Sequence, residues 1–323
     1  MGHLLEVNDL VVKFALRTGE LTAIDNISFF LDKGDRLGIV GESGAGKSVT
    51  GFSILNLISK PGYISSGNVL FEGKDLAYAS PNHLRHIRGN RISMIFQDPM
   101  MTLNPVLTIG DQMIETVLAH RNISRKDAAA LAVKKLKQVH IPSPEKRLSQ
   151  YPHEFSGGMR QRIVIAISLI TDPALIIADE PTTALDVTIQ AEIMELLFDL
   201  CETNNTGLIL ITHDLGVVSQ VTENIAVMYA GKIVEIGTTA NIVSNPQHPY
   251  TQGLIKALPR ARAAGKKLYQ IPGNMPNLTD IPKGCAFNPR CEKAIDRCRE
   301  EKPELLQRGE FKRLVGCFRV GEK

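Results

Sequence analysis

Two stretches near the N-terminus, residues 4–14 and 21–31, alternate apolar and polar side chains. Alternation with a period of two is typical of strands with one buried face, so these stretches predict two antiparallel strands joined by a turn. Residues 36–40 form a short apolar run that leads directly into glycines, and residues 48–59 have the apolar spacing of a helix. A strand, a glycine-rich loop and a helix in this order predict an α/β fold.

The pattern changes in the middle of the chain. Helix formers dominate from about residue 105 to residue 155, which predicts a helical subdomain inserted into the α/β fold. After it, short apolar runs alternate with helical patterns and predict a parallel sheet. The expected elements are strands at 68–72 and 91–97, a helix at 157–170, a strand at 174–179, a helix at 187–203, a strand at 207–212 and a hairpin at 224–236.

The composition changes again near Pro246, after which prolines are dense and regular periodicity is lost. The sequence therefore predicts two domains. The first, residues 1–255, would hold the α/β fold, and the second, residues 256–323, would be a small loop-rich extension. Four of the five cysteines lie in this extension, whereas Cys201 falls in an expected helix and should be buried there.

Composition excludes several classes of protein. Hydrophobic residues make up 43% of the 323 residues, which is enough for a sizeable core and excludes a fully disordered chain. The net charge of +3 and the absence of tryptophan argue against nucleic acid as a partner. We also expect no transmembrane helix, because no run of about 18 uncharged apolar residues exists. The N-terminus lacks the pattern of a secretory signal.

The first chemical motif follows the strand at residues 36–40 and fits the pattern G-x-x-x-x-G-K-[ST] of a phosphate-binding loop. It reads Gly41, Glu42, Ser43, Gly44, Ala45, Gly46, Lys47, Ser48. Glycines let successive backbone N–H groups point at phosphate oxygens, and the following helix adds its positive N-terminal dipole. We expect Lys47 to reach the β- and γ-phosphates of a nucleotide and the Ser48 hydroxyl to bind Mg²⁺.

Two adjacent carboxylates, Asp179 and Glu180, follow the apolar strand at 174–179. Ligands of parallel sheets lie just beyond the carboxyl ends of the strands. We therefore expect Asp179 to hold the Mg²⁺, and Glu180 to act as the general base towards the attacking water.

A second anion-binding helix start is predicted after Phe155. It reads Ser156, Gly157, Gly158, Met159, Arg160, Gln161. One nucleotide needs a single phosphate loop, so a second such site about 115 residues further on suggests that two chains share each nucleotide.

This set of motifs resembles the nucleotide-binding subunit of an ATP-binding-cassette (ABC) transporter over about residues 5–255. Residues 156–161 resemble the family signature, in which Phe155 stands in place of the usual leucine. The resemblance implies further roles for single residues: Gln97 as the glutamine-loop residue that reaches the Mg²⁺, Asp186 as the D-loop aspartate, His213 as the switch histidine and Phe14 as the aromatic that stacks on adenine. The implied fold is an ABC-type P-loop NTPase with an N-terminal antiparallel β subdomain.

The sequence Gln97 to Pro105 and the motif His248-Pro249-Tyr250-Thr251 are similar to the dipeptide/oligopeptide permease branch. The resemblance implies ATP and Mg²⁺ as cofactors, a second ATPase subunit (a hetero-pair or a homodimer), two transmembrane permease subunits and an extracytoplasmic substrate-binding protein. It also implies a place at the cytoplasmic face of a bacterial or archaeal membrane. A nickel or other small-solute importer and a soluble ABC ATPase remain alternatives. The apolar residues Met100, Met101 and Leu103 predict either a groove for the permease or packing inside this chain.

The four cysteines of the extension, Cys285, Cys291, Cys298 and Cys317, have the spacing C-x5-C-x6-C-x18-C. Clustered cysteines outside an oxidising compartment indicate metal or redox chemistry. The short C-x2–4-C pairs of zinc sites are missing, so the spacing favours an iron–sulfur cluster. The extension resembles that of peptide-permease ATPases, some of which carry a [4Fe-4S] cluster there. Zinc, and thiols without metal or in disulfides, remain alternatives.

Overall fold

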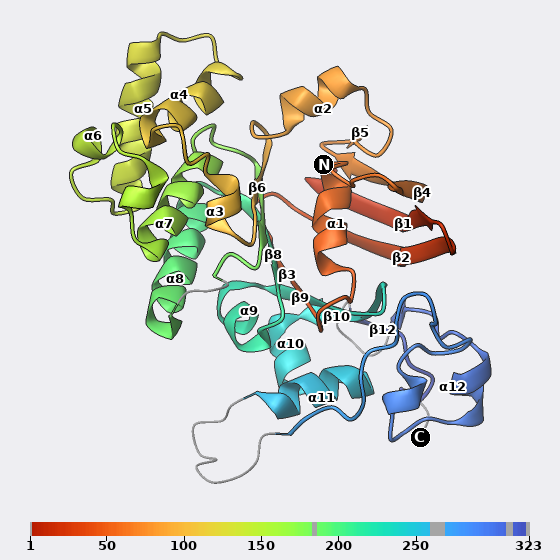
Figure 1. Cartoon of the computed structure of the whole chain (residues 1–323). Helices are drawn as coiled ribbons and strands as arrows, with labels where there is room; N and C mark the ends of the chain where they lie inside the picture. Colours follow the sequence, from red (N-terminus) through yellow and green to blue (C-terminus); the bar gives the residue numbers. More distant parts are fainter. Residues whose placement is uncertain (1, 183–185, 259–268, 308–312, 321–323) are drawn as a thin grey trace. The chain divides into compact units, whose positions relative to one another are not determined.

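The computed structural model describes residues 2–182, 186–258, 269–307 and 313–320 (Figure 1). The chain forms two compact units. Unit 1 comprises Met1–Leu31, Arg36–Tyr78 and Ile211–Lys323, and unit 2 comprises Asp32–Asp35 and Ala79–Leu210. No helix in the described ranges is long and apolar enough to cross a membrane.

An antiparallel sheet forms the N-terminal part of unit 1. Its strands, in the order β2-β1-β4-β5, are β2 (Gly19–Leu31), β1 (Leu5–Leu16), β4 (Gly62–Phe71) and β5 (Lys74–Asp75). The inward side chains of β1, among them Leu5, Val7 and Leu10, are fully buried. The two strands predicted from alternation at residues 4–14 and 21–31 are therefore confirmed, and β1 pairs with β2 in antiparallel register.

A second set of strands in unit 1 carries the predicted phosphate loop. β3 (Arg36–Val40) lies parallel to β9 (Asn224–Tyr229), which forms a hairpin with β10 (Lys232–Thr238). The hairpin turns at Ala230 and Gly231, which both have positive φ, as a tight type I′ turn requires. Both the strand at 36–40 and the hairpin were predicted from the sequence.

The extension at residues 256–323 belongs to unit 1. Its strand β12 (Leu314–Val315) pairs antiparallel with β10, and β11 (Leu306–Gln307) pairs with β12. Arg313, directly before β12, donates from Nε to the fully buried Glu235 carboxylate at 2.9 Å. The helices of unit 1 are α1 (Lys47–Ile54), α9 (Leu215–Val221), α10 (Thr239–Ser244), α11 (Pro249–Ala257), η2 (Asn288–Arg290) and α12 (Asp296–Glu300).

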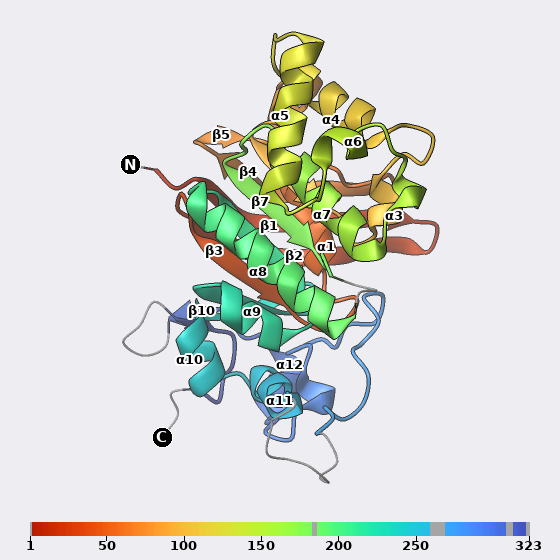
Figure 2. The ribbon, with the colours of Figure 1, turned by 90° about the vertical axis from the view of Figure 1, so that its left-hand side faces the viewer.

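Unit 2 combines two parallel strands with a cluster of helices. β6 (Ile92–Ile95) lies parallel to β7 (Leu175–Asp179), and β8 (Gly207–Thr212) carries the chain into unit 1. The helices are α2 (Pro81–Ile87), α3 (Pro99–Thr102), α4 (Ile109–Leu118), α5 (Arg125–Gln138), α6 (Pro144–Arg147), η1 (Pro152–Glu154), α7 (Gly157–Ser168) and α8 (Val187–Thr203). Helices α4 to α7 gather at one end of the unit, and α8 runs as one long helix (Figure 2).

Serine and threonine side chains fix the starts of the longer helices in this cluster. Thr108 accepts from the Asp111 N–H at the start of α4, and Ser124 accepts from the Asp127 N–H at the start of α5. Such caps satisfy backbone donors that a helix start leaves unpaired. The helix-rich region expected at 105–155 is confirmed as α4, α5, α6 and η1.

Candidate functional site

The loop from Gly41 to Ser48 joins β3 to α1 and depends on its glycines. Gly44 and Gly46 have φ values of +81° and +100°, a region that side chains rarely tolerate. A Cβ on Gly41 would lie 2.3 Å from the carbonyl oxygen of Met228 in β9. Glycine is therefore required at these positions, and the curled backbone can turn its N–H groups towards an anion, as the sequence predicts.

Lys47 is folded along this loop. Its side chain is buried, and its ammonium donates to the carbonyl oxygens of Gly41 at 2.9 Å and of Glu42 at 3.0 Å. The positive charge is thus held at the loop itself, where phosphate oxygens can replace the two carbonyls as partners. Ser48 follows within the first turn of α1, next to this charge.

Glu42 is anchored by two residues to which the sequence analysis assigned no role at this loop. Its backbone N–H donates to the phenol oxygen of Tyr250 at 2.9 Å, and its carboxylate accepts from Nη1 of Arg290 at 2.9 Å. Tyr250 lies in α11, and burial raises its pKa, so its hydroxyl stays protonated. Local spacing carries no signal for these contacts, because 208 and 248 residues separate the partners.

The two predicted carboxylates lie at the end of β7. Asp179 is the last residue of the strand and is buried, and Glu180 follows with a φ of +45°. A glutamate in the left-handed region is strained, and such strain persists where the surrounding structure holds it. Gln97, two residues beyond the parallel neighbour β6, donates from Nε2 to the Glu180 carboxylate at 3.1 Å. The structure therefore brings Gln97, Asp179 and Glu180 to the same edge of the strands.

The predicted signature begins α7. Ser156 is the N-cap and accepts from the Met159 N–H at 3.4 Å, and both Ser156 and Gly157 are exposed. Phe155 is buried, with the guanidinium carbon of Arg147 at 5.7 Å from its ring centroid. The start of this helix is thus open to a second molecule.

The rest of the signature lies closer to the core. A Cβ on Gly158 would be 3.0 Å from the side chain of Ile189 in α8, so the two helices approach closely there. Arg160 donates from Nε to the carbonyl oxygen of Pro152 at 3.0 Å. Gln161 is only 1% exposed, and its Nε2 has no partner within the ranges that the structure describes. A direct contact with a partner's nucleotide remains a prediction for this motif, with Gln161 below the surface.

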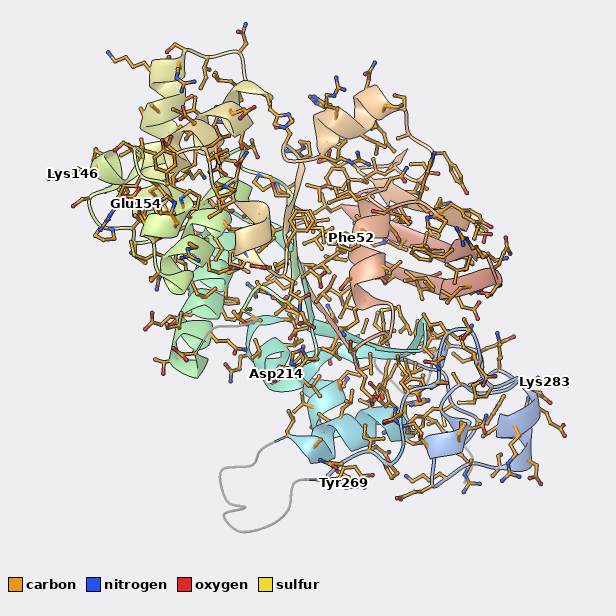
Figure 3. The ribbon with its side chains drawn as sticks, in the orientation of Figure 1. Phe52, Lys146, Glu154, Asp214, Tyr269 and Lys283 are labelled. Carbon is orange, nitrogen blue, oxygen red and sulfur yellow. The ribbon has the colours of Figure 1, made fainter. Side chains whose placement is uncertain are left out.

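His213 directly follows β8 and is exposed. The next residue, Asp214, is labelled in Figure 3. It caps α9 by accepting from the N–H groups of Gly216 at 2.8 Å and Val217 at 3.3 Å. The histidine is therefore held at a rigid junction between a strand and a helix. Phe14 is half-buried on β1, opposite Leu21 and Gly62 of the neighbouring strands.

Two predicted features fall partly outside the described residues. Asp186 is exposed at the start of α8, whereas Ala184 and Leu185 of the predicted D-loop lie outside those residues. The side chains of Met100 and Met101 lie outside them as well.

Of the two alternatives predicted for residues 100–103, a permease groove or packing inside this chain, packing holds for Leu103. Residues 99–102 form the helix α3, and Leu103 is buried within this chain, with only 3% of it exposed. Val106, close by in the chain, is an apolar residue that faces solvent, with 75% of it exposed.

The four cysteines of the extension meet at one pocket. Cys285, Cys291, Cys298 and Cys317 all line it, together with aromatic and polar residues of the extension and with His248 and Pro249 at the start of α11. Burial raises the pKa of the Cys285 thiol to about 11, and the neighbouring sulfurs add to this effect. Burial also raises the pKa values of Cys291 and Cys317. Four thiols whose anions repel one another suit a cation that compensates their charge. Among the described residues, however, no group of three or more metal-binding side chains has the arrangement of a metal site.

Comparison with known proteins agrees with this geometry. A family model described as "ABC transporter" matches residues 24–183, and one described as "Oligopeptide/dipeptide transporter, C-terminal region" matches residues 234–298. The chain is 52% identical over 307 residues to the oligopeptide transport ATP-binding protein OppD of Bacillus subtilis (strain 168), with 94% of this chain and 86% of the relative covered. The chain belongs to the ABC-transporter ATP-binding proteins of the oligopeptide/dipeptide type.

Other relatives and a solved structure support the same family assignment. The dipeptide transport ATP-binding protein DppD of the same organism is 51% identical, with 98% of this chain and 95% of the relative covered. Among solved structures, the dimeric structure of MJ0796, a bacterial ABC transporter cassette, covers 73% of this chain and 98% of its own with a TM-score of 0.65 and 25% identity. Membership of the family confirms the ABC-type fold and ATP hydrolysis by this chain, as the resemblance implied.

Proposed function

We propose that ATP hydrolysis by this chain drives the import of oligopeptides or dipeptides. Its full-length similarity to transport ATP-binding proteins named for these substrates supports the proposal, as does the match of the extension to a peptide-transporter region. The structural observation that carries the ATPase role is the glycine-dependent loop closed by the Lys47 ammonium.

Each residue of the candidate site has a proposed task. Lys47 and the loop N–H groups bind the β- and γ-phosphates, and Ser48, Gln97 and Asp179 hold the Mg²⁺. Glu180 takes the proton of the attacking water, and its contact with Gln97 supports a shared place at the γ-phosphate. The residues assigned to nucleotide binding are Gly41, Glu42, Ser43, Gly44, Ala45, Gly46, Lys47, Ser48, Phe14 and Asp179, with His213 as the switch residue.

The ATPase is proposed to work as a pair of chains. The exposed start of α7 supports this, because Ser156 and Gly157 can reach the nucleotide of a second subunit. The partner is either another copy or a related ATPase, and the pair drives two transmembrane permease subunits at the cytoplasmic face of the membrane. An extracytoplasmic binding protein delivers the peptide.

Reconstitution with its cognate permease subunits tests the substrate. Peptides of two to five residues, presented by the cognate binding protein, should stimulate ATP hydrolysis in proteoliposomes, whereas Ni²⁺ should not. Stimulation by Ni²⁺ alone would identify a nickel importer and contradict the peptide assignment. The Glu180→Gln complex serves as the control that binds ATP without turnover.

We further propose that the four cysteines hold a [4Fe-4S] cluster, with a zinc ion as the alternative. Their common pocket supports this, because thiolates are the donors that both groups prefer. The bound group would cross-link the extension, while the chain's own residues carry out hydrolysis. Anaerobically purified protein should absorb broadly near 400 nm and contain about four irons per chain. Colourless protein with one zinc per chain would establish the alternative.

A further inference from the structure

Arg290 connects the cysteine-rich extension to the phosphate loop. It ends the short turn η2, directly before Cys291, and is only 9% exposed. Its guanidinium donates from Nη1 to the Glu42 carboxylate at 2.9 Å and to the Tyr229 hydroxyl at 3.3 Å, and from Nε to the carbonyl oxygen of Pro272 at 2.8 Å. One buried cation thus holds three segments of unit 1 together.

The ion pair between Arg290 and Glu42 acts on the part of the phosphate loop that orients Lys47. Glu42 is fixed by Arg290 through its carboxylate and by Tyr250 through its N–H. Its carbonyl oxygen, in turn, is an acceptor of the Lys47 ammonium. A shift of Glu42 would therefore move both the loop backbone and the catalytic lysine.

A second link leads from the same arginine to the same loop. Arg290 holds the backbone at Pro272, and three residues later the Cε atom of Met275 would lie 3.0 Å from a Cβ on Gly44. The segment that Arg290 secures thus packs directly against the middle of the phosphate loop.

Phe287 connects Arg290 with the cysteine pocket. Phe287, which lines this pocket, packs against Tyr229 and Tyr250 with ring centroids 5.2 Å and 5.4 Å away. The guanidinium carbon of Arg290 lies 5.9 Å from the Phe287 ring. The short stretch between Cys285 and Cys291 therefore carries both the aromatic residue and the arginine that brace the nucleotide site.

We propose that Arg290 is a positioning residue of the ATPase, which holds the phosphate loop in its nucleotide-binding conformation through Glu42. The cysteine-rich extension is then part of the nucleotide site, and its loss weakens ATP binding even though it supplies no contact to the nucleotide. This inference rests on the proposed role of residues 41–48 in phosphate binding.

Equilibrium binding of a fluorescent MgATP analogue to the full-length chain tests the proposal. Arg290→Ala and Glu42→Ala should each raise Kd about tenfold, the scale of one charge-assisted hydrogen bond. The double variant should be no worse than either single variant, because both remove the same pair. Arg290→Lys should recover part of the affinity. In the assembled transporter, KM for ATP should rise while kcat stays within about twofold.

Two control variants distinguish a wrong role for Arg290 from a wrong assignment of the phosphate loop. Arg299 lies in the same extension, its side chain is 66% exposed, and it pairs with Asp296 three residues away, so Arg299→Ala should leave Kd unchanged. Lys47→Ala should abolish binding; if it does not, the assignment of the phosphate loop fails rather than the role of Arg290. Wild-type Kd in both Arg290→Ala and Glu42→Ala, with binding lost in Lys47→Ala, would overturn the proposal. Two further results together would also overturn the proposal: the losses of ATP affinity in the two single variants add up in the double variant, and proteolysis of the extension is faster only in Arg290→Ala. Arg290 would then have a purely structural role.

Discussion

Arg313→Ala should destabilise unit 1 strongly. The Glu235 carboxylate is completely buried and accepts hydrogen bonds from Arg313 and from the backbone N–H groups of Gln247 and His248, each at 2.9 Å. The mutation removes the only cation in this set and leaves a buried charge with two neutral donors. Arg313 also donates to the carbonyl oxygen of Asn245 at 2.7 Å, which would lose this donor.

The expected loss in free energy of unfolding is about 3–5 kcal/mol, the usual cost of removing one partner of a buried ion pair. That is a large part of the roughly 5–15 kcal/mol that stabilises a typical domain. Urea unfolding of the purified chain, followed by circular dichroism, measures it as a lower midpoint of the unit 1 transition.

The matched control is Arg299→Ala, because the Arg299–Asp296 pair is exposed and should contribute no more than about 1 kcal/mol. Replacing Glu235 and Arg313 together by methionine should restore most of the loss, since apolar residues of similar size leave no buried charge. A loss below about 1 kcal/mol in Arg313→Ala would refute the reasoning, because it would mean that the Glu235 charge is not stabilised by Arg313.

Further substitutions test the nucleotide site and the extension. Glu180→Gln should lower ATP turnover of the assembled transporter by roughly 10²-fold or more while MgATP still binds, since only the basic carboxylate is lost; near-normal turnover would exclude Glu180 as the base. Gly157→Asp should abolish hydrolysis but leave ATP binding by the single chain within a few-fold, because the new charge faces only a partner's nucleotide; equal loss of binding would contradict a shared site. Cys291→Ser should remove bound metal and expose residues 280–307 to protease; unchanged protection in a metal-free sample would contradict the metal's structural role.

Patterns that lie within a few residues predicted much of the fold. The strands β1 and β2, the hairpin of β9 and β10 and the helix α8 follow from periodicity alone. The helix expected at 48–59 is shorter, because Asn56 takes a left-handed φ of 50° and its side chain donates to the carbonyl oxygen of Ala77. That partner lies 21 residues away, beyond the reach of a local pattern.

The candidate site likewise contains residues that a local motif identifies and residues that only the folded structure brings together. The phosphate loop and the two carboxylates of β7 could be found by motif, because their function fixes short runs of residue types. Neither Tyr250 nor Arg290 could be assigned to the loop, because their contacts with Glu42 depend on how distant segments pack. Leu103 was ambiguous for a similar reason, since an apolar residue after Gln97 can face either a partner or the core of its own unit.

The anchoring of Glu42 also constrains the order in which the protein can mature. A ribosome makes the phosphate loop early, yet Tyr250 follows Glu42 by 208 residues and Arg290 by 248. Closing loops of this length is entropically costly and makes the contacts late events in folding. A nascent chain that has already formed β3 and α1 therefore still lacks both anchors of its phosphate loop. Its native affinity for ATP can arise only after the extension has been synthesised and has folded against the phosphate loop. ATP binding would therefore report that these distant segments have come together.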